Sequence, residues 1–272
     1  MNIEQILKKI TELKRANTNY VSNGCFNVAQ WKRLNEKGLI SATVYDKSVW
    51  VTIRDKDIYR LLFFADSTES LTQVNARQYR DYDMPVILEF LCKQDTNEKV
   101  QNILIEMGFC RLRDLEYLFC TSVHIGEKYQ LQAGYSISIA VAKDCMTLYN
   151  MLYDIFDIRI SRLPSEEQII SDIDSQHVFI LKHEQEIVGI AYFQRQGAKA
   201  EYLYQFALQS KERGKGLSYA LLAYAMNCLG IEKKYSAWVE KDNVKAIHLY
   251  EKFGFENVGL KEFIYQYKQE AN

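Results

Sequence analysis

Residues 208–218 read Leu-Gln-Ser-Lys-Glu-Arg-Gly-Lys-Gly-Leu-Ser and lie between a strand-like run, Tyr202 to Leu208, and a helix-like run, Leu217 to Leu229. Glycine tolerates backbone conformations that other residues avoid, so the two glycines allow a sharp turn that exposes backbone N–H groups. The following helix adds the partial positive charge of its N-terminus. The stretch therefore predicts an anion-binding turn that could hold a phosphate.

A second motif, residues 243–255, reads Asn-Val-Lys-Ala-Ile-His-Leu-Tyr-Glu-Lys-Phe-Gly-Phe. Within it, Asn243, Ala246, Tyr250 and Gly254 follow one another at spacings of three, four and four residues. Side chains at such spacings share one face of an α-helix. The pattern predicts a helix that ends at Gly254, which is a typical C-terminal cap.

Together the two motifs resemble the acyl-CoA site of the GCN5-related N-acetyltransferase (GNAT) family, whose signature is Arg/Gln-x-x-Gly-x-Gly/Ala. Here the signature corresponds to residues 213–218, and Ser218 departs from the glycine or alanine of the family. The resemblance implies an α/β fold, with a mixed and mostly antiparallel sheet flanked by helices. It also implies direct transfer of an acetyl group from acetyl-CoA to a primary amine of a small molecule, an amino-acid derivative or a peptide.

The resemblance assigns three parts of the chain to coenzyme A. The glycine turn would cradle the pyrophosphate, and a backbone N–H near the end of the preceding strand would polarise the thioester carbonyl. In the family that strand carries a bulge and splays from its neighbour, which opens space for the pantetheine arm. The residues so assigned are Phe206, Ala207, Leu208, Arg213, Gly214, Lys215, Gly216, Leu217, Ser218 and Asn243.

Two proton transfers complete the implied reaction. Tyr250 stands at the family position for protonating the thiolate, and a phenol with a pKa of about 10 can donate to a thiolate whose conjugate acid has a pKa of about 8.5. The base for the amine is less defined, because family members use a carboxylate, a water chain or no dedicated group. Glu201 begins one candidate strand and Glu240 ends another, and either could face the acceptor or solvent.

The C-terminal half predicts a mixed α/β domain. Its elements are expected at residues 135–142 (strand), 145–158 (helix), a helix after Ser165, 178–182 and 187–195 (hairpin), 202–208 (strand), 217–229 (helix), 235–239 (strand), 243–253 (helix) and 263–267 (strand). In the N-terminal half, a helix is expected at 3–15 and strands at 48–53, 58–64 and 85–91.

The N-terminal half also contains a diverged copy of the second motif. Residues 97–109 align without gaps on residues 243–255, and the match extends to 116–119 on 262–265. This copy lacks an Arg-Gly-x-Gly turn and has Leu104 in place of Tyr250. We therefore predict two domains, a degenerate and non-catalytic GNAT-like domain at 1–128 and an acetyltransferase domain at 129–272.

Composition limits the other functions. The chain has 272 residues with 34 basic and 35 acidic side chains, so nucleic acid and acidic membranes are not expected partners. The residues contain no apolar run of the ~18 needed to span a bilayer, and the N-terminus reads as an amphipathic helix, which predicts a cytoplasmic protein. The six cysteines form no CxxC pair and are expected as free thiols, and no cluster predicts a metal site.

Two other functions stay open. One is a non-catalytic acyl-CoA-binding or interaction protein that kept the glycine turn without turnover. The other is a two-domain aminoacyltransferase that takes its acyl group from tRNA, although such an enzyme has no need of the turn at 213–218 and the chain has no basic block. The sequence does not indicate the oligomeric state.

Overall fold

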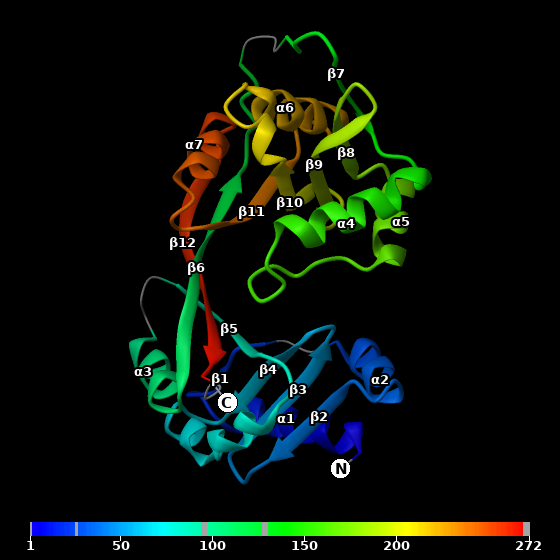
Figure 1. The fold of residues 1–272 in the computed structure, drawn as a ribbon. Coiled ribbons are helices and arrows are strands. Elements are labelled where there is room, and N and C mark those ends of the chain that lie inside the picture. Colours follow the sequence, from blue (N-terminus) through cyan, green and yellow to red (C-terminus); the bar gives the residue numbers. More distant parts are fainter. Residues whose placement is uncertain (1, 25–26, 94–96, 127–129, 269–272) are drawn as a thin grey trace. The chain divides into compact units, whose positions relative to one another are not determined.

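The computed structural model describes residues 2–24, 27–93, 97–126 and 130–268, and it divides into two compact units (Figure 1). Unit 1 comprises Met1–Asp114 with Leu260–Asn272, and unit 2 comprises Leu115–Gly259. The units differ in extent from the two predicted domains, since residues 115–126 lie in unit 2 and residues 260–268 in unit 1. The predicted boundary at 128/129 lies outside the described residues, and the domain assignment stays a prediction.

Unit 2 contains a mixed sheet in the order β6-β11-β10-β9-β8-β7. Strands β10 and β11 pair in parallel, and the other neighbours in this order pair antiparallel, as predicted for the fold. The strands are β7 (Tyr135–Ile139), β8 (Val178–His183), β9 (Glu186–Arg195), β10 (Ala200–Leu208), β11 (Lys234–Glu240) and the part of β6 (Phe109–Cys120) from Leu115 onward.

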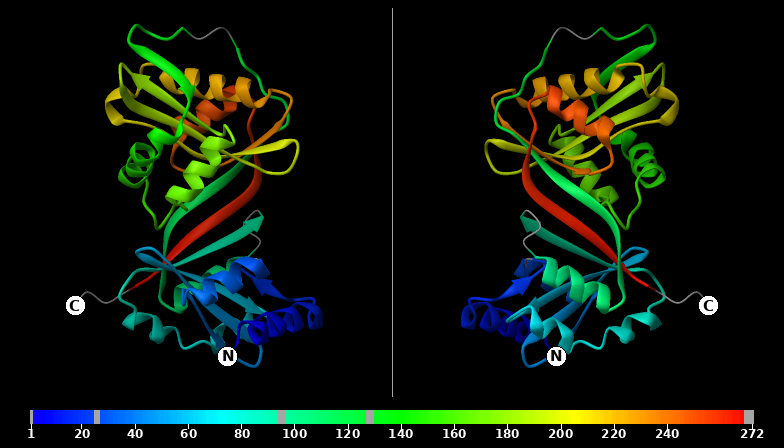
Figure 2. Two further views of the ribbon diagram at one scale, coloured as in Figure 1. Left: turned by 90° about the vertical axis from the view of Figure 1, so that its right-hand side faces the viewer. Right: turned by 90° about the vertical axis from the view of Figure 1, so that its left-hand side faces the viewer.

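Helices cover both faces of this sheet (Figure 2). The pair α4 (Cys145–Ile155) and α5 (Glu166–Asp174) buries Leu148, Leu152, Ile169 and Ile173 on one face. The pair α6 (Leu217–Leu229) and α7 (Val244–Lys252) packs on the other face through residues that include Leu221 and Tyr250. Each element predicted between residues 135 and 267 is present, although the last strand, β12 (Glu256–Tyr267), begins at Glu256 rather than Phe263.

Unit 1 repeats much of this arrangement with the sheet order β2-β3-β4-β5-β12, and short β1 pairs with β4. Strands β4 and β5 pair in parallel, as β10 and β11 do in unit 2. Helices α1 and α2 cover one face, and α3 with two 3₁₀ helices covers the other. The elements are α1 (Ile3–Ala16), β1 (Val21–Ser22), α2 (Val28–Glu36), β2 (Ile40–Val44), β3 (Ser48–Asp55), β4 (Ile58–Ala65), η1 (Glu69–Gln73), η2 (Ala76–Asp81), β5 (Val86–Lys93) and α3 (Glu98–Glu106).

The sequence repeat corresponds to a repeated strand-helix-strand segment, β5-α3-β6 and β11-α7-β12. Helices α3 (98–106) and α7 (244–252) are related by the predicted offset of 146 residues at both ends. However, the last strand of each copy pairs with the first strand of the other copy. Residues 115–120 of β6 pair with β11 in unit 2, and residues 260–266 of β12 pair with β5 in unit 1.

Two further predictions concern the cysteines and membrane-spanning helices. Five of the six cysteines are described and all five are free thiols, whereas Cys25 lies outside the described residues. Across the part of the chain that is described, no helix is both long and apolar enough to cross a membrane.

Candidate functional site

The parallel pair β10 and β11 separates partway along its length. The strands pair from Ala200↔Lys234 to Leu203↔Ala237, and a register shift between Leu203 and Gln205 marks a bulge in β10. Beyond the bulge, β10 pairs with β9 alone and β11 with β6 alone. Each strand thus has N–H and C=O groups that point toward the other strand without a ladder partner there. We call residues 204–208 and 238–240 the splayed edges of unit 2.

The glycine turn follows directly after the splayed end of β10. Gly214 and Gly216 have φ angles of 80° and 77°, in the left-handed region that glycine adopts without a steric penalty. A Cβ added to either glycine would meet no atom within 4 Å, so the backbone conformation, and not crowding, requires glycine here. Gly216 is the N-cap of α6, which begins with no side-chain cap among the described residues. The first N–H groups of α6 are therefore available to an anion.

The two cationic side chains of the turn already have partners within unit 2. The Nζ of Lys215 lies 2.8 Å from Oε2 of Glu212 and 3.0 Å from the hydroxyl of Tyr135. The Nε of Arg213 donates to the carbonyl of Leu208 at 3.3 Å, which ties the turn to the end of β10. Hydrogen bonding to Lys215 lowers the pKa of Glu212, and the same bond raises the pKa of Lys215. The backbone of the turn is thus its more open anion-binding feature.

Tyr250 lies beside the splayed end of β10. Its ring centroid is 6.3 Å from that of Phe206 and 5.6 Å from that of Phe255, and the residue is 5% exposed. Burial raises the pKa of Tyr250, which keeps the phenol protonated. Within the described part of the chain, its hydroxyl has no hydrogen-bond partner. The structure thus places the rings of Tyr250 and Phe206 near each other.

Asn243 serves as the N-cap of α7. Its Oδ1 accepts a hydrogen bond from the backbone N–H of Ala246 at 3.2 Å. Capping of this kind stabilises a helix by about 1 kcal/mol. A contact between Asn243 and coenzyme A stays a prediction, and its side-chain oxygen is already engaged by the helix.

The two candidate carboxylates have different surroundings. Glu201 is 1% exposed, and its oxygens lie 2.6 Å from Nζ of Lys233 and 3.3 Å from Nε2 of His177. It pairs with Tyr235, in the part of β10 that is still joined to β11. Glu240 is half-buried at the splayed end of β11, roughly 16 Å further along that strand at 3.3 Å per residue. The ion pair with Lys233 gives Glu201 a structural environment, whereas Glu240 lies at the splayed end of β11. A role as base for either carboxylate stays a prediction.

The sequence did not predict a group of aromatic side chains on the sheet face that Glu240 shares. Trp238 and Tyr117 are cross-strand partners with ring centroids 4.9 Å apart, and those of Tyr202 and Tyr204 are 5.9 Å apart. All four rings are half-buried. We call these four residues the aromatic row. The alternation of Tyr202 and Tyr204 was a visible signal, but Tyr117 comes from the first half of the chain through the exchanged strand β6.

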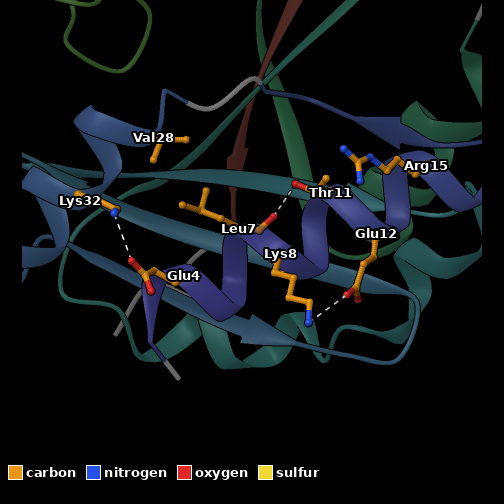
Figure 3. A pocket seen from close by; sticks show the side chains of 8 residues that line it. All are labelled: Glu4, Leu7, Lys8, Thr11, Glu12, Arg15, Val28 and Lys32. Carbon is orange, nitrogen blue, oxygen red and sulfur yellow. Dashed lines mark hydrogen bonds and ion pairs between the residues drawn. The ribbon is translucent and has the colours of Figure 1, made fainter.

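A surface pocket in unit 1 contains none of the predicted site residues. It lies between α1 and α2 (Figure 3), where Glu4 of α1 pairs with Lys32 of α2 at 3.2 Å, while Lys8 and Glu12 pair along α1 at 3.9 Å. Among the residues that the structure describes, no group of three or more His, Cys, Asp or Glu side chains could hold a metal ion.

Comparisons with known proteins assign part of the chain to a family. Residues 145–255 match the model of the acetyltransferase (GNAT) family, so this part of the chain is a GNAT domain, and it lies within unit 2. No curated protein matches the chain.

Solved structures extend the likeness beyond the GNAT domain. A GCN5-related N-acetyltransferase from Sphaerobacter thermophilus matches with a TM-score of 0.59 and 12% identity over 92% of this chain and 95% of its own. One from Kribbella flavida matches with a TM-score of 0.53 and 14% identity over 90% and 96%. A tandem GNAT protein from the clavulanic acid biosynthesis pathway matches with a TM-score of 0.53 and 10% identity over 84% and 83%. At these identities the matches show a shared fold, which includes a tandem GNAT arrangement.

Proposed function

We propose that the chain is an N-acetyltransferase that moves an acetyl group from acetyl-CoA directly to a primary amine. The acceptor would be a small molecule, an amino-acid derivative or a peptide. The observation that carries the proposal is the position of Tyr250, a buried and protonated phenol beside the bulged strand that leads into the glycine turn. A binding protein without turnover would have no use for a proton donor at this point.

Acetyl-CoA would bind through backbone groups more than through side chains. We place its pyrophosphate on the turn at 213–216 and the first turn of α6, whose N–H groups and partial positive charge favour an anion. The pantetheine arm would pair with the splayed edges of unit 2. A backbone N–H near Phe206 would then polarise the thioester carbonyl, since β10 has no ladder partner on that side.

The reaction needs proton transfers at the amine and at the thiolate. Glu240 would take a proton from the cationic amine, directly or through water, and the neutral amine would then attack the thioester carbon. The C–S bond breaks in the resulting tetrahedral intermediate, and the thiolate takes a proton from Tyr250. The nitrogen loses its second proton to solvent, and solvent returns a proton to Tyr250. Raising the pKa of Tyr250 makes it a weaker acid, but it also ensures that the proton is present when the thiolate forms.

We place the acceptor amine over the aromatic row, on the sheet face that Glu240 shares. Aromatic faces attract an ammonium group and stack on flat or apolar ones, so this surface suits an amine that carries an apolar or aromatic group. The carboxylate of Glu240 would draw the cationic amine toward the splayed end of β11.

The test pairs a binding measurement with a turnover measurement. In a thermal-shift titration, acetyl-CoA at ~100 times its dissociation constant should stabilise the protein by about 2.7 kcal/mol, a shift of several degrees. The double variant Arg213→Glu, Gly216→Glu should lose this shift. Release of free coenzyme A thiol with a panel of primary amines should then identify acceptors. Absence of a shift in a folded parent would rule out the acetyl-CoA site, and a shift without turnover on any amine would favour the non-catalytic alternative.

A further inference from the structure

In unit 1, the strands that correspond to β10 and β11 also separate. Strands β4 and β5 pair in parallel only at Tyr59↔Val86 and Arg60↔Ile87. Beyond this point we call residues 61–65 of β4 and 88–93 of β5 the splayed edges of unit 1. Their outer sides pair with β3 and β12, so the edges that face each other need other partners.

The chain itself supplies those partners. Residues 21–24, which we call the Asn23 segment, include β1, which pairs antiparallel with the splayed edge of β4 at Val21↔Ala65 and Ser22↔Phe64. Among the described residues of unit 2, no strand lies in the corresponding place between β10 and β11. The two units therefore share a splayed parallel pair, and only unit 1 fills it with a strand of its own.

The Asn23 side chain bridges both edges. Its Nδ2 donates to the carbonyls of Leu61 and Glu89, each at 2.9 Å, and its Oδ1 accepts from the N–H of Phe63 at 2.6 Å. Its backbone N–H donates to the carbonyl of Phe63 at 3.3 Å. Asn23 is 9% exposed, and buried backbone groups without partners are costly. The carboxamide of Asn23 thus satisfies backbone groups of unit 1. The corresponding groups of unit 2 are those that the amides of a pantetheine arm would meet.

The connection from β4 to β5 in unit 1 also lacks a phosphate-binding turn. Residues 66–85, which connect β4 to β5, contain no glycine and form the two short 3₁₀ helices η1 and η2 where unit 2 has the turn and α6. Leu71 and Tyr79 from these helices are buried in the core of unit 1. The connection therefore contributes hydrophobic packing and presents no helix N-terminus like that of α6.

We infer that the Asn23 segment occupies, in unit 1, the place that acyl-CoA takes between the splayed strands of unit 2, so that each chain binds a single acyl-CoA. The inference rests on the proposed function of unit 2. It gives a physical reason why the first copy cannot bind the co-substrate: the Asn23 segment already satisfies the edges that the pantetheine arm would need.

Isothermal titration calorimetry of the full chain with acetyl-CoA tests the stoichiometry. One site per chain is expected for the parent, and none for the Arg213→Glu, Gly216→Glu double variant. Two sites in the parent, or one site that survives in the double variant, would overturn the inference while leaving an acetyl-CoA-binding protein. No binding to the parent would instead remove the proposed function, and the inference with it.

Hydrogen exchange tests the segment itself. In Asn23→Ala we expect amides of residues 61–65 to exchange at least tenfold faster than in the parent, because the N–H of Phe63 loses its acceptor. Asn27→Ala is the matched control, since Asn27 caps α2 by accepting from Gln30 at 3.2 Å and should leave residues 61–65 unchanged. Unchanged exchange at 61–65 in Asn23→Ala would contradict the bridging role. Should that variant fail to fold, Asn23→Leu, which keeps about the same side-chain size but removes both the Oδ1 acceptor and the Nδ2 donor, replaces it.

Discussion

Tyr250 combines burial with a hydroxyl that no described residue engages, and this combination separates it from the buried Tyr235. Tyr235, for comparison, donates its hydroxyl to the carbonyl of Gly230 at 2.8 Å. A phenol with an internal partner contributes to stability, whereas one without a partner is available to a substrate atom. This contrast provides a matched pair of substitutions.

We predict that Tyr250→Phe lowers kcat about 100-fold, the scale of general acid catalysis, and leaves the affinity for acetyl-CoA within about twofold of the parent. Tyr235→Phe should destabilise the fold by about 1 kcal/mol and leave kcat nearly unchanged. Steady-state kinetics and thermal unfolding of both variants check this. Equal kcat in the parent and Tyr250→Phe would remove the tyrosine from the mechanism.

The pH dependence of turnover follows from the same residue. Because burial raises the pKa of Tyr250 above its ordinary value of about 10, the phenol keeps its proton throughout the neutral and mildly alkaline range. We predict that kcat shows no loss from tyrosine ionisation up to about pH 9.5. A pH profile of kcat at saturating substrates measures this, and an alkaline decline below pH 9 that Tyr250→Phe abolishes would contradict it.

Trp238 provides a prediction for the acceptor side. Removal of the indole in Trp238→Ala should raise KM for the amine at least about tenfold, the scale of one aromatic contact, with KM for acetyl-CoA unchanged. Trp238→Phe keeps a ring against Tyr117 and should recover most of the loss. A parallel rise in both KM values would indicate a general distortion of β11 and not a contact with the acceptor.

At the scale of elements, the turn before α6 is held by a buried carboxylate. Glu212 is 2% exposed and binds Lys215 and Tyr135, and its Oε1 lies 3.7 Å from Nδ1 of His183. Strand β7, strand β8 and the turn are therefore linked through one side chain. The glycines set the backbone conformation of the turn, and Glu212 fixes where the turn sits.

This link predicts an acid-dependent stability. Lys215 and Tyr135 lower the pKa of Glu212, so the stabilisation is present above its ordinary pKa of about 4.3 and is lost as the pH falls through the lower value of the folded state. The Tm deficit of Glu212→Gln should accordingly be largest near pH 7 and shrink below about pH 4. Thermal unfolding at several pH values measures it. Glu186→Gln, which breaks an exposed pair with Lys211, is the control with little expected change. A deficit for Glu212→Gln that does not change with pH would contradict the assignment.

At the scale of the whole molecule, the exchanged strands make the halves of the chain differ from the units of the structure. Residues 115–120 precede the predicted boundary, yet they form six register pairs with Tyr235–Glu240 and bury Leu118 and Cys120 in the core of unit 2. A fragment that starts at residue 129 would lack this strand and would leave β11 as an open edge.

We therefore predict that a fragment of residues 115–259 unfolds cooperatively and that a fragment of residues 129–259 does not. Loss of the strand removes its backbone pairing with β11 and two buried side chains. Each of these side chains contributes about 1–3 kcal/mol to the free energy of unfolding. Circular dichroism during thermal unfolding distinguishes the two fragments. Equal melting temperatures would show that residues 115–120 are dispensable for unit 2.

The sequence by itself determined the local elements and the motif positions of unit 2. Glycine at 214 and 216, the helical spacing of Asn243 and Tyr250, and the alternation in the strands depend on neighbours in the chain, and the structure has the expected elements there. The same local signals revealed the repeat of α3 and α7.

Tertiary structure alone decided four features of this protein: the exchange of β6 and β12, the ion pair of Glu201 with Lys233, the aromatic row and the insertion of the Asn23 segment. Each depends on which distant segment reaches a given strand edge. A strand edge accepts any backbone, and two similar copies offer nearly equivalent partners, so local pattern does not specify the pairing. The glycine turn thus indicates where acetyl-CoA could bind, and only the packing shows that the Asn23 segment lies between the splayed edges of unit 1.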